Sequence, residues 1–393
     1  MQLGFLDLAS PEFSTRSQAV RDARAANWCA RTPYGLAVLR HREVGLLLRD
    51  RRLRQGSHSW PDTNGLEGSF AEFWKRSVIG QEGELHKSLR RVVTTALASD
   101  FIATLKPDFD RIADELAAPL AQRERFDFMQ AFSEPFAGKA ICLLLGLDLN
   151  DWAKVSYDAS DLGLAMGVEC KSHENTFNAA HRRLADLSDE LVARSRAGCH
   201  PEGFIGRLVR AFDEDGTLDD PQFLQDLVVI CIFGGVDTTK SQLGFVMSQF
   251  AAAPDQWKLL QQDLTLVGNV VEESIRARPT TTWATREALE DFEFGGQVIK
   301  KGEILHMLVH ASARDPLVCD TPDFDITAKR KIHFGFGGGA HHCLGHEVAR
   351  TDMASAIAAL ARHLPSFTYD AEPSFLPDSG NTSPVALPLR FLD

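Results

Sequence analysis

The stretch Phe334–Arg350, FGFGGGAHHCLGHEVAR, decides the fold of this chain. Four glycines precede a single cysteine, Cys343, and apolar residues recur at helical spacing beyond it, which predicts a helix that begins at the cysteine. Glycines allow positive φ and let the backbone approach a bulky partner closely. A thiol at a helix N-terminus lies among unpaired N–H groups and the positive end of the helix dipole, which favours the thiolate. Such a thiolate suits an axial iron ligand, whereas the simpler alternative is a glycine-rich turn with a buried cysteine.

Length and composition limit the class of protein. The chain has 393 residues, of which 44% are hydrophobic and 24% are charged, as in ordinary soluble globular proteins. Its formal net charge of −12 argues against nucleic acid as a general partner. The seven cysteines form no C-x-x-C pair, so we expect free thiols in a reducing compartment and no zinc framework. No signal peptide and no apolar run of about 18 residues are visible, so the expectation is a cytoplasmic protein without membrane insertion.

A second informative stretch is Asp226–Ala252, a long apolar segment that contains Gly234 and Gly235. Each glycine costs a helix interior about 1 kcal/mol relative to alanine, which makes sense if something large lies against the backbone there. A Thr hydroxyl in the same segment can bond to a carbonyl one turn back and open the helix locally. The alternative is a bent helix of the core.

Charged pairs and an aromatic segment complete the residue-level observations. His86 and Arg90 share a helix face and suit a carboxylate such as a propionate, although a solvated basic face is the commoner case. Glu273 and Arg276, three residues apart, can form an ion pair on one helix face. The segment Trp60–Gly80, rich in glycine and aromatic residues, predicts a loop whose aromatic side chains fill the core.

Four patterns follow one another along the chain: H-x-x-x-R at 86–90, G-G-x-D-T at 234–238, E-x-x-R at 273–276 and F-x-x-G-x-x-x-C-x-G at 336–345. In this set and order they resemble the motifs of the cytochrome P-450 family. The resemblance implies one haem domain over residues 1–393, mainly α with small β-sheets, that binds haem b. It also implies electrons that come ultimately from NAD(P)H through a [2Fe-2S] ferredoxin with its reductase, or through a flavodoxin.

The same resemblance gives roles to individual residues. Cys343 would be the proximal haem ligand, Asp237 would serve a proton relay, and Thr238 would hydrogen-bond the oxygen that binds at iron. The residues expected to bind haem are His86, Arg90, Gly234, Gly235, Arg286, Phe336, His341 and Gly345, with Gly235 admitting dioxygen and the four cationic or imidazole side chains holding propionates. The residues expected to touch substrate are Thr281, Thr282, Trp283, Asn381 and Thr382, although strand propensity alone also explains residues 281–283.

The function that these patterns predict is a haem-thiolate monooxygenase. It would insert one oxygen atom of O2 into a C–H bond of a small, mainly hydrophobic substrate. A peroxide-driven peroxygenase or a non-catalytic haem sensor or carrier would not need Asp237 and Thr238, and a haem-free helical binding protein would leave the cysteine unexplained. The basic cluster Lys329–Lys331 is expected near the proximal haem face, where it would attract an acidic redox partner.

Overall fold

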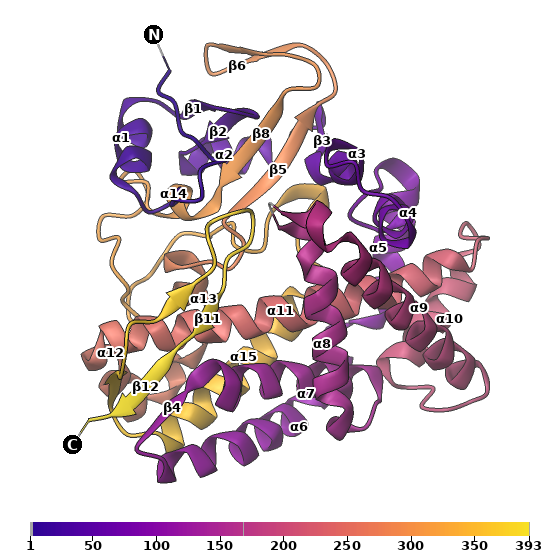
Figure 1. Cartoon of the computed structure of the whole chain (residues 1–393), viewed down its shortest axis with the longest axis vertical. Coiled ribbons are helices and arrows are strands. Elements are labelled where there is room, and N and C mark those ends of the chain that lie inside the picture. The colour runs from indigo at the N-terminus through magenta and orange to yellow at the C-terminus, as the bar shows by residue number, and fades with distance from the viewer. Residues whose placement is uncertain (1–2, 168, 393) are drawn as a thin grey trace.

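Helices make up most of the molecule and small sheets flank them, as the sequence predicts (Figure 1). The computed structural model describes residues 3–167 and 169–392. The helices are α1 (Gln18–Ala26), α2 (His41–Leu47), α3 (Trp60–Thr63), α4 (Ser69–Arg76), α5 (Gly83–Ala96), α6 (Ser99–Ala117), α7 (Glu134–Leu145), α8 (Trp152–Gly163), α9 (Glu174–Arg196), α10 (Phe204–Asp215), α11 (Gln222–Ala252), α12 (Pro254–Gln262), α13 (Val267–Ala277), α14 (Val309–Ala313) and α15 (His346–His363). Within the described ranges, no helix is both long enough and apolar enough to span a bilayer.

The largest sheet joins two distant parts of the chain. The strands are β1 (Cys29–Thr32), β2 (Gly35–Val38), β3 (Leu53–Gln55), β4 (Arg125–Asp127), β5 (Trp283–Ala288), β6 (Phe292–Phe294), β7 (Gln297–Ile299), β8 (Ile304–Leu308), β9 (Phe367–Tyr369), β10 (Ser374–Phe375), β11 (Pro384–Ala386) and β12 (Pro388–Phe391). Five of them form one sheet in the order β1-β2-β8-β5-β3. In that sheet β2 and β8 run parallel, and β3 pairs antiparallel with β5 so that Gln55 lies opposite Arg286.

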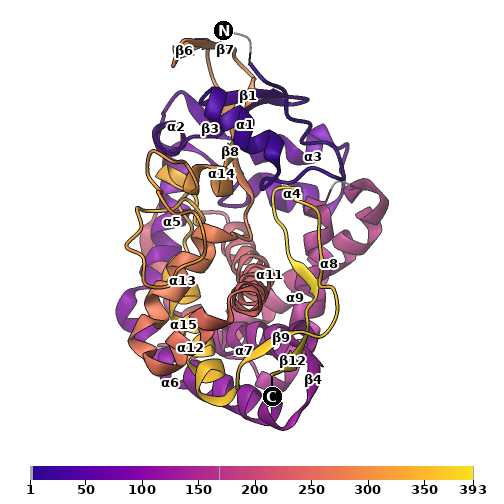
Figure 2. The ribbon, with the colours of Figure 1, turned by 90° about the vertical axis from the view of Figure 1, so that its left-hand side faces the viewer.

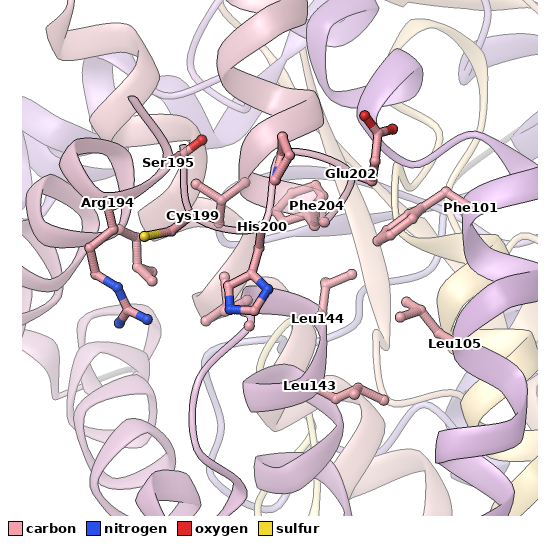
Figure 3. Close-up of a pocket in the computed structure, with 16 residues that line it drawn as sticks. Phe101, Leu105, Leu143, Leu144, Arg194, Ser195, Cys199, His200, Glu202 and Phe204 are labelled. Carbon is pink, nitrogen blue, oxygen red and sulfur yellow. The ribbon is translucent and has the colours of Figure 1, made fainter. Parts of the chain in front are cut away.

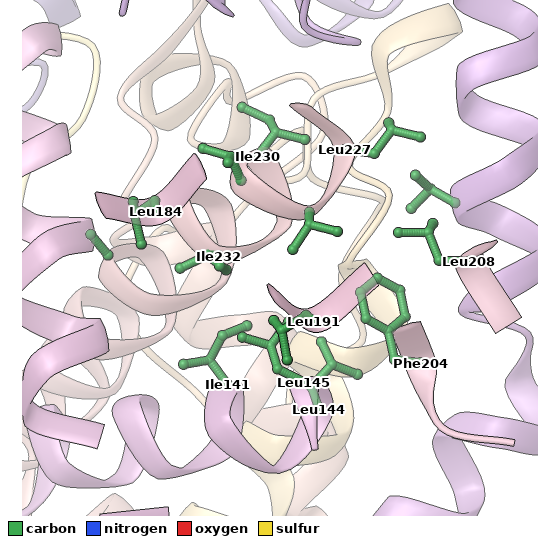
Figure 4. Close-up of a cluster of buried hydrophobic side chains, with 14 of the residues drawn as sticks. Ile141, Leu144, Leu145, Leu184, Leu191, Phe204, Leu208, Leu227, Ile230 and Ile232 are labelled. Atoms are coloured by element: carbon green, nitrogen blue, oxygen red, sulfur yellow. The ribbon is translucent and has the colours of Figure 1, made fainter. Parts of the chain in front are cut away.

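Helix α11 passes through the middle of the molecule, where Figure 2 shows it end-on among the other helices. Its residues are apolar on nearly all sides because helices surround it, and most of its side chains are buried. Figure 4 shows one of the resulting clusters, in which side chains from α7, α9, α10 and α11 converge. Pro254 follows the helix closely, consistent with the poor fit of proline inside a helix. The long helix is therefore packed against neighbouring helices along most of its length.

The aromatic segment 60–80 folds differently from the prediction. The structure shows α3 and α4 here rather than a loop. The non-helical connection between these two helices is short and contains Gly65 and Gly68, both at positive φ. Phe70, Phe73 and Trp74 are buried, and the Phe70 and Trp74 rings stack at 5.7 Å. The prediction of a loop was wrong because the glycines suggested a longer irregular segment, but the prediction that the aromatic side chains fill the core is confirmed.

Candidate functional site

The cysteine loop, residues 334–345, folds back on itself between α14 and α15. The amide of Cys343 donates to the carbonyl of Phe336 at 2.9 Å and fixes the base of the loop. A Cβ atom at Gly339, whose φ is +69°, would overlap the Leu48 carbonyl oxygen of the segment that follows α2. Glycine is therefore required where the loop touches a neighbouring backbone.

The helix after the cysteine begins later than predicted. α15 starts at His346, so Cys343 lies in the turn before it rather than at the helix N-terminus. The Cys343 side chain is exposed, yet the protein atoms packed around its sulfur desolvate it and raise the pKa of the thiol, while the Gly345 amide, Arg90 and Arg350 act in the opposite direction. The expected preference for thiolate therefore does not come from the helix dipole, and a bound metal ion is what would deprotonate this thiol.

The middle of α11 lies opposite the cysteine loop. Cys231 of α11 and Leu344, next to Cys343, pack against the same hydrophobic cluster, so this side of α11 faces the cysteine loop. Burial, together with Cys343, raises the pKa of the Cys231 thiol to about 12. Gly234, one turn further along, is exposed within an otherwise buried helix, and a Cβ atom there would meet no atom within 4 Å. A Cβ atom at Gly345 would also meet no atom within 4 Å. The absence of side chains at these two positions would let a broad group lie against the backbone of α11 and of the loop.

The other glycine of the α11 pattern faces elsewhere. A Cβ atom at Gly235 would lie 3.0 Å from Cδ1 of Ile141, so this glycine accommodates the packing of α7. The role of admitting dioxygen, expected of Gly235, stays a prediction. The hydroxyl of Thr238 donates to the carbonyl of Gly234 at 2.6 Å, which is the backbone bond predicted from the sequence.

Asp237 points toward α8 rather than toward the cysteine loop. Its Oδ1 lies 2.8 Å from Nζ of Lys240 and accepts a hydrogen bond from the Ser160 hydroxyl at 3.0 Å. The Lys240 side chain is largely buried, with 17% of its surface exposed. The carboxylate is therefore held by a cation and a hydroxyl on the side of α11 that packs against α8.

Two arginines beside the cysteine loop lack a carboxylate partner within salt-bridge distance in the described parts of the chain. Arg286 is buried and donates to Oε1 of Gln55 at 3.0 Å and to the carbonyl of Gly338 at 3.1 Å. Burial lowers its pKa to about 10. Arg90 donates to the carbonyl of His342 at 2.8 Å, and burial also lowers its pKa. A buried guanidinium such as that of Arg286, and a half-buried one such as that of Arg90, are costly without a counter-ion, which fits a site for anionic groups.

Two histidines gather at the same place. The rings of His86 and His341 lie 4.1 Å apart, and Nε2 of His341 lies 2.9 Å from Oε1 of Glu82. Nε2 of His86 is buried without a hydrogen-bond partner. Burial lowers the pKa of His86 to about 4, with His341 and Arg90 acting in the same direction. An orphaned imidazole nitrogen beside unpaired guanidinium groups fits a haem whose propionates end here, so the residues present suit that cofactor.

The residues expected to touch substrate come from two segments that the structure brings together. Thr281 and Asn381 form an antiparallel bridge, and the amide of Thr382 donates to the carbonyl of Thr280 at 2.9 Å. The hydroxyl of Thr282 is buried and has no hydrogen-bond partner.

Trp283 lies beside the same turn, since a Cβ atom at Gly380 would be 3.7 Å from its indole nitrogen. Its ring meets Phe13 and His306 edge-on, at 6.2 and 5.7 Å. Side chains alternate along a strand, so Trp283 lies on the face of β5 opposite Arg286.

The E-x-x-R pair forms as predicted. Arg276 binds both carboxylate oxygens of Glu273, at 2.6 and 2.7 Å, and both side chains are 3% exposed. Arg330 also binds Glu273, at 3.2 Å to each oxygen. The prediction that Arg330 belongs to a docking patch was therefore wrong, because its guanidinium is a third member of this buried network. Lys329 and Lys331 are exposed.

Some supporting residues carry no signal in the sequence. Glu272 binds Arg350 at 2.6 Å and His333 at 3.2 Å, and so links α13 to α15 just after the cysteine loop. Burial alone would raise the pKa of Glu272, but the hydrogen bonds from His333 and Arg350 lower it to about 2. Arg350 in turn covers the Phe336 ring at 4.5 Å, which holds this aromatic residue of the loop in place. Glu272, which precedes Glu273 of the E-x-x-R pair, thus connects α13 to the residues around the cysteine loop.

A separate cavity of about 390 Å³ lies away from these residues (Figure 3). It is bounded by α6, the C-terminal ends of α7 and α9, and the start of α10, with Cys199 and His200 at its edge. None of its lining residues belongs to the four sequence patterns. The site gathered around Cys343 is distinct from this cavity.

Comparisons with known proteins agree with this arrangement. The family model described as Cytochrome P450 matches residues 166–377. Luteothin monooxygenase of Streptomyces thioluteus is 36% identical, with 99% of this chain and 96% of that protein covered. Nocardicin C N-oxygenase of Nocardia uniformis subsp. tsuyamanensis is 28% identical, with 92% and 91% covered. The crystal structure of CalO2 superposes with a TM-score of 0.86 at 28% identity, with 98% of this chain and 99% of that chain covered.

Proposed function

The chain belongs to the cytochrome P450 family and is a monooxygenase of that family, and on this premise we propose that it inserts one oxygen atom of O2 into a C–H bond of a small, mainly hydrophobic molecule. The family implies haem b as the cofactor, and haem supplies the activation of O2 when it is bound. The observation that carries the proposal is the opposition of Cys343 and the open face of α11 at Gly234. We take residues 1–393 as one haem domain.

In this proposal the cysteine loop holds the iron. Cys343 would provide the sulfur that binds the iron, and the Gly345 amide, which acts to lower the pKa of this thiol, would moderate its basicity. Gly345 would leave room for the cofactor beside the loop. Phe336, whose ring lies under the Arg350 guanidinium at 4.5 Å, would support the loop that presents the sulfur.

The two haem propionates would lie beside the hydrogen-bond donors that surround the cysteine loop. His86, Arg90, Arg286 and His341 would each offer an N–H group to one of the two carboxylates, and charge-assisted bonds of this kind are stronger than neutral ones. The cofactor would thereby neutralise the two buried guanidinium groups.

Asp237 and Thr238 would serve proton delivery on the α11 side. The Thr238 hydroxyl can donate to an oxygen above it when it leaves the Gly234 carbonyl, since a hydroxyl both donates and accepts. Asp237 would take protons from the α8 side through Ser160 and pass them toward Thr238. Lys240 fixes the orientation of the carboxylate.

The substrate would lie near Thr281, Thr282, Asn381 and Thr382. The buried, unpaired Thr282 hydroxyl is the group best placed to recognise a polar atom on a mainly hydrophobic substrate. The environment of Trp283 gives it a supporting role against Phe13. The relatives are named for luteothin and nocardicin C, so related chains act on different small molecules.

Electrons would come from NAD(P)H through a [2Fe-2S] ferredoxin with its reductase, or through a flavodoxin. Lys329 and Lys331 are the exposed cations of the predicted docking cluster and would attract an acidic partner in a salt-dependent way. All seven cysteines are free thiols, which favours a reducing compartment such as the cytoplasm.

The absorption spectrum of the ferrous–CO complex tests the proposal. The purified protein should show the red-shifted Soret band of thiolate-ligated haem. Cys343→Ala should abolish that band, whereas the matched control Cys199→Ala, at an exposed cysteine, should retain it. A red-shifted band that persists in Cys343→Ala would overturn the assignment of the ligand.

A further inference from the structure

A ring of hydrogen bonds starts and ends in the cysteine loop. Nε2 of His341 meets Oε1 of Glu82 at 2.9 Å, and the same oxygen accepts the backbone N–H of Gln55 at 2.7 Å. The Gln55 side chain then accepts from Arg286 at 3.0 Å, and Arg286 donates to the Gly338 carbonyl at 3.1 Å. We name this ring the anchor circuit. Glu82 and Gln55 belong to none of the four sequence patterns.

Glu82 fixes the orientation of one donor. Because its carboxylate accepts from Nε2 of His341, that ring nitrogen carries the hydrogen and Nδ1 remains for another partner. Burial would raise the pKa of Glu82, but the hydrogen bonds from His341 and Gln55 outweigh it and lower that pKa. Glu82 is therefore a stable anion.

Gln55 links the two sides of the circuit. Its backbone N–H holds Glu82, while its side-chain oxygen holds Arg286, which sits opposite it in the β3–β5 pairing. The strand register thus fixes the separation between the two donors. A displacement of β3 would therefore disturb the contacts of Gln55 with both Glu82 and Arg286.

A metal ion is the other occupant that this cluster suggests. Ligand atoms of Glu82, His86 and His341 all lie within 4.8 Å of one another. Two nearby guanidinium groups would repel a bound cation. Arg90 is close enough to His86 to lower its pKa, and Arg286 interacts with Glu82. The local charge therefore favours an anionic group beside His341.

We propose that Glu82 and Gln55 are positioning residues that hold His341 and Arg286 in place for the two haem propionates. The inference rests on the proposed function, because it requires bound haem. Outer partners of this kind commonly change cofactor affinity by about 10–100-fold. Neither residue touches the reacting atoms in this arrangement.

The rate of haem transfer to excess apomyoglobin tests the inference, with the ferrous–CO spectrum recorded on each preparation. Glu82→Gln keeps the size of the side chain but removes its charge, and we expect haem to leave about tenfold faster. The matched control is Glu84→Gln, two residues away, where an exposed carboxylate pairs only with Lys87. That variant should release haem at the parental rate.

A double-mutant cycle separates positioning from a general structural effect. In a His341→Phe background, Glu82→Gln should cause no further acceleration, because the partner through which it acts is absent. If Glu82→Gln yields no haem-loaded protein, Gln55→Leu tests the Arg286 side of the circuit. This variant keeps the backbone N–H that binds Glu82 and removes only the side-chain oxygen that accepts from Arg286, so haem should leave about tenfold faster. Release at the parental rate would overturn the inference.

The outcomes distinguish this inference from the proposed function. A normal ferrous–CO spectrum with Glu82→Gln indistinguishable from Glu84→Gln overturns the inference alone. If Glu82→Gln accelerates haem release as much in the His341→Phe background as in the parent, the inference is also overturned, because Glu82 would then not act through His341. A parent protein without the thiolate spectrum overturns both.

Discussion

Glu273→Gln should destabilise the protein far more than the same change at its neighbour. Glu273 accepts hydrogen bonds from Arg276, from Arg330 and from the backbone N–H of Asp325, and it is 3% exposed. Glutamine removes the charge and leaves two guanidinium groups buried without a counter-ion. Breaking a buried pair in this way costs about 3–5 kcal/mol. For a chain of 393 residues, this lowers the melting temperature by about 4–6 °C.

The free energy of unfolding from urea titration of the haem-loaded protein measures this effect. The matched control is Glu272→Gln, because Glu272 is on the same helix turn and pairs with Arg350, but its side chain is 45% exposed. Solvent screening limits its expected loss to about 1 kcal/mol. A loss for Glu273→Gln no larger than that of Glu272→Gln would refute the reasoning that burial makes the network sensitive.

Two further predictions concern the loop and α11. Gly337 and Gly339 both have φ near +70°, so alanine at either position costs about 1–2 kcal/mol of backbone strain. In urea titration, Gly339→Ala should lower the free energy of unfolding clearly more than Gly337→Ala. The reason is that the Cβ at position 339 would overlap the Leu48 carbonyl, whereas that at position 337 meets its nearest atom at 3.5 Å. Equal losses would contradict this account of the loop contact. Thr238→Val should release more peroxide per electron consumed with a bound substrate, whereas the isosteric change at its buried neighbour, Thr239→Val, should leave coupling unchanged. Unchanged peroxide release in Thr238→Val would remove this hydroxyl from proton delivery.

The sequence singles out residues where a pattern fixes one residue type at one spacing. Cys343, His341 and the His86–Arg90 pair stand in such patterns, and the structure brings them to one place. Their roles toward haem stay predictions. The ion pair of Glu273 with Arg276 follows from helical spacing. The helix boundary was missed because the turn that orients Cys343 needs two more residues before α15 begins.

The residues that support these groups could not be predicted in the same way. Glu82 meets His341 across 259 residues of chain, and Gln55 uses its backbone N–H, which any residue except proline possesses. Arg330 sits between two lysines and therefore resembles a solvated charge run, although its partner lies 57 residues away. Such partners are chosen by tertiary packing, which local patterns do not record.

The pairing of β3 with β5 also affects the order of events during synthesis. Gln55 and Arg286 are separated by 231 residues, so a ribosome that adds roughly 5–20 residues per second needs on the order of 10–50 s between them. His86 and Arg90 emerge early, yet the sheet that frames them cannot close until β5 and β8 have been made. Non-local pairing of this kind is slow to form. Haem capture should therefore be among the last steps of biogenesis, when nearly the whole chain has left the ribosome.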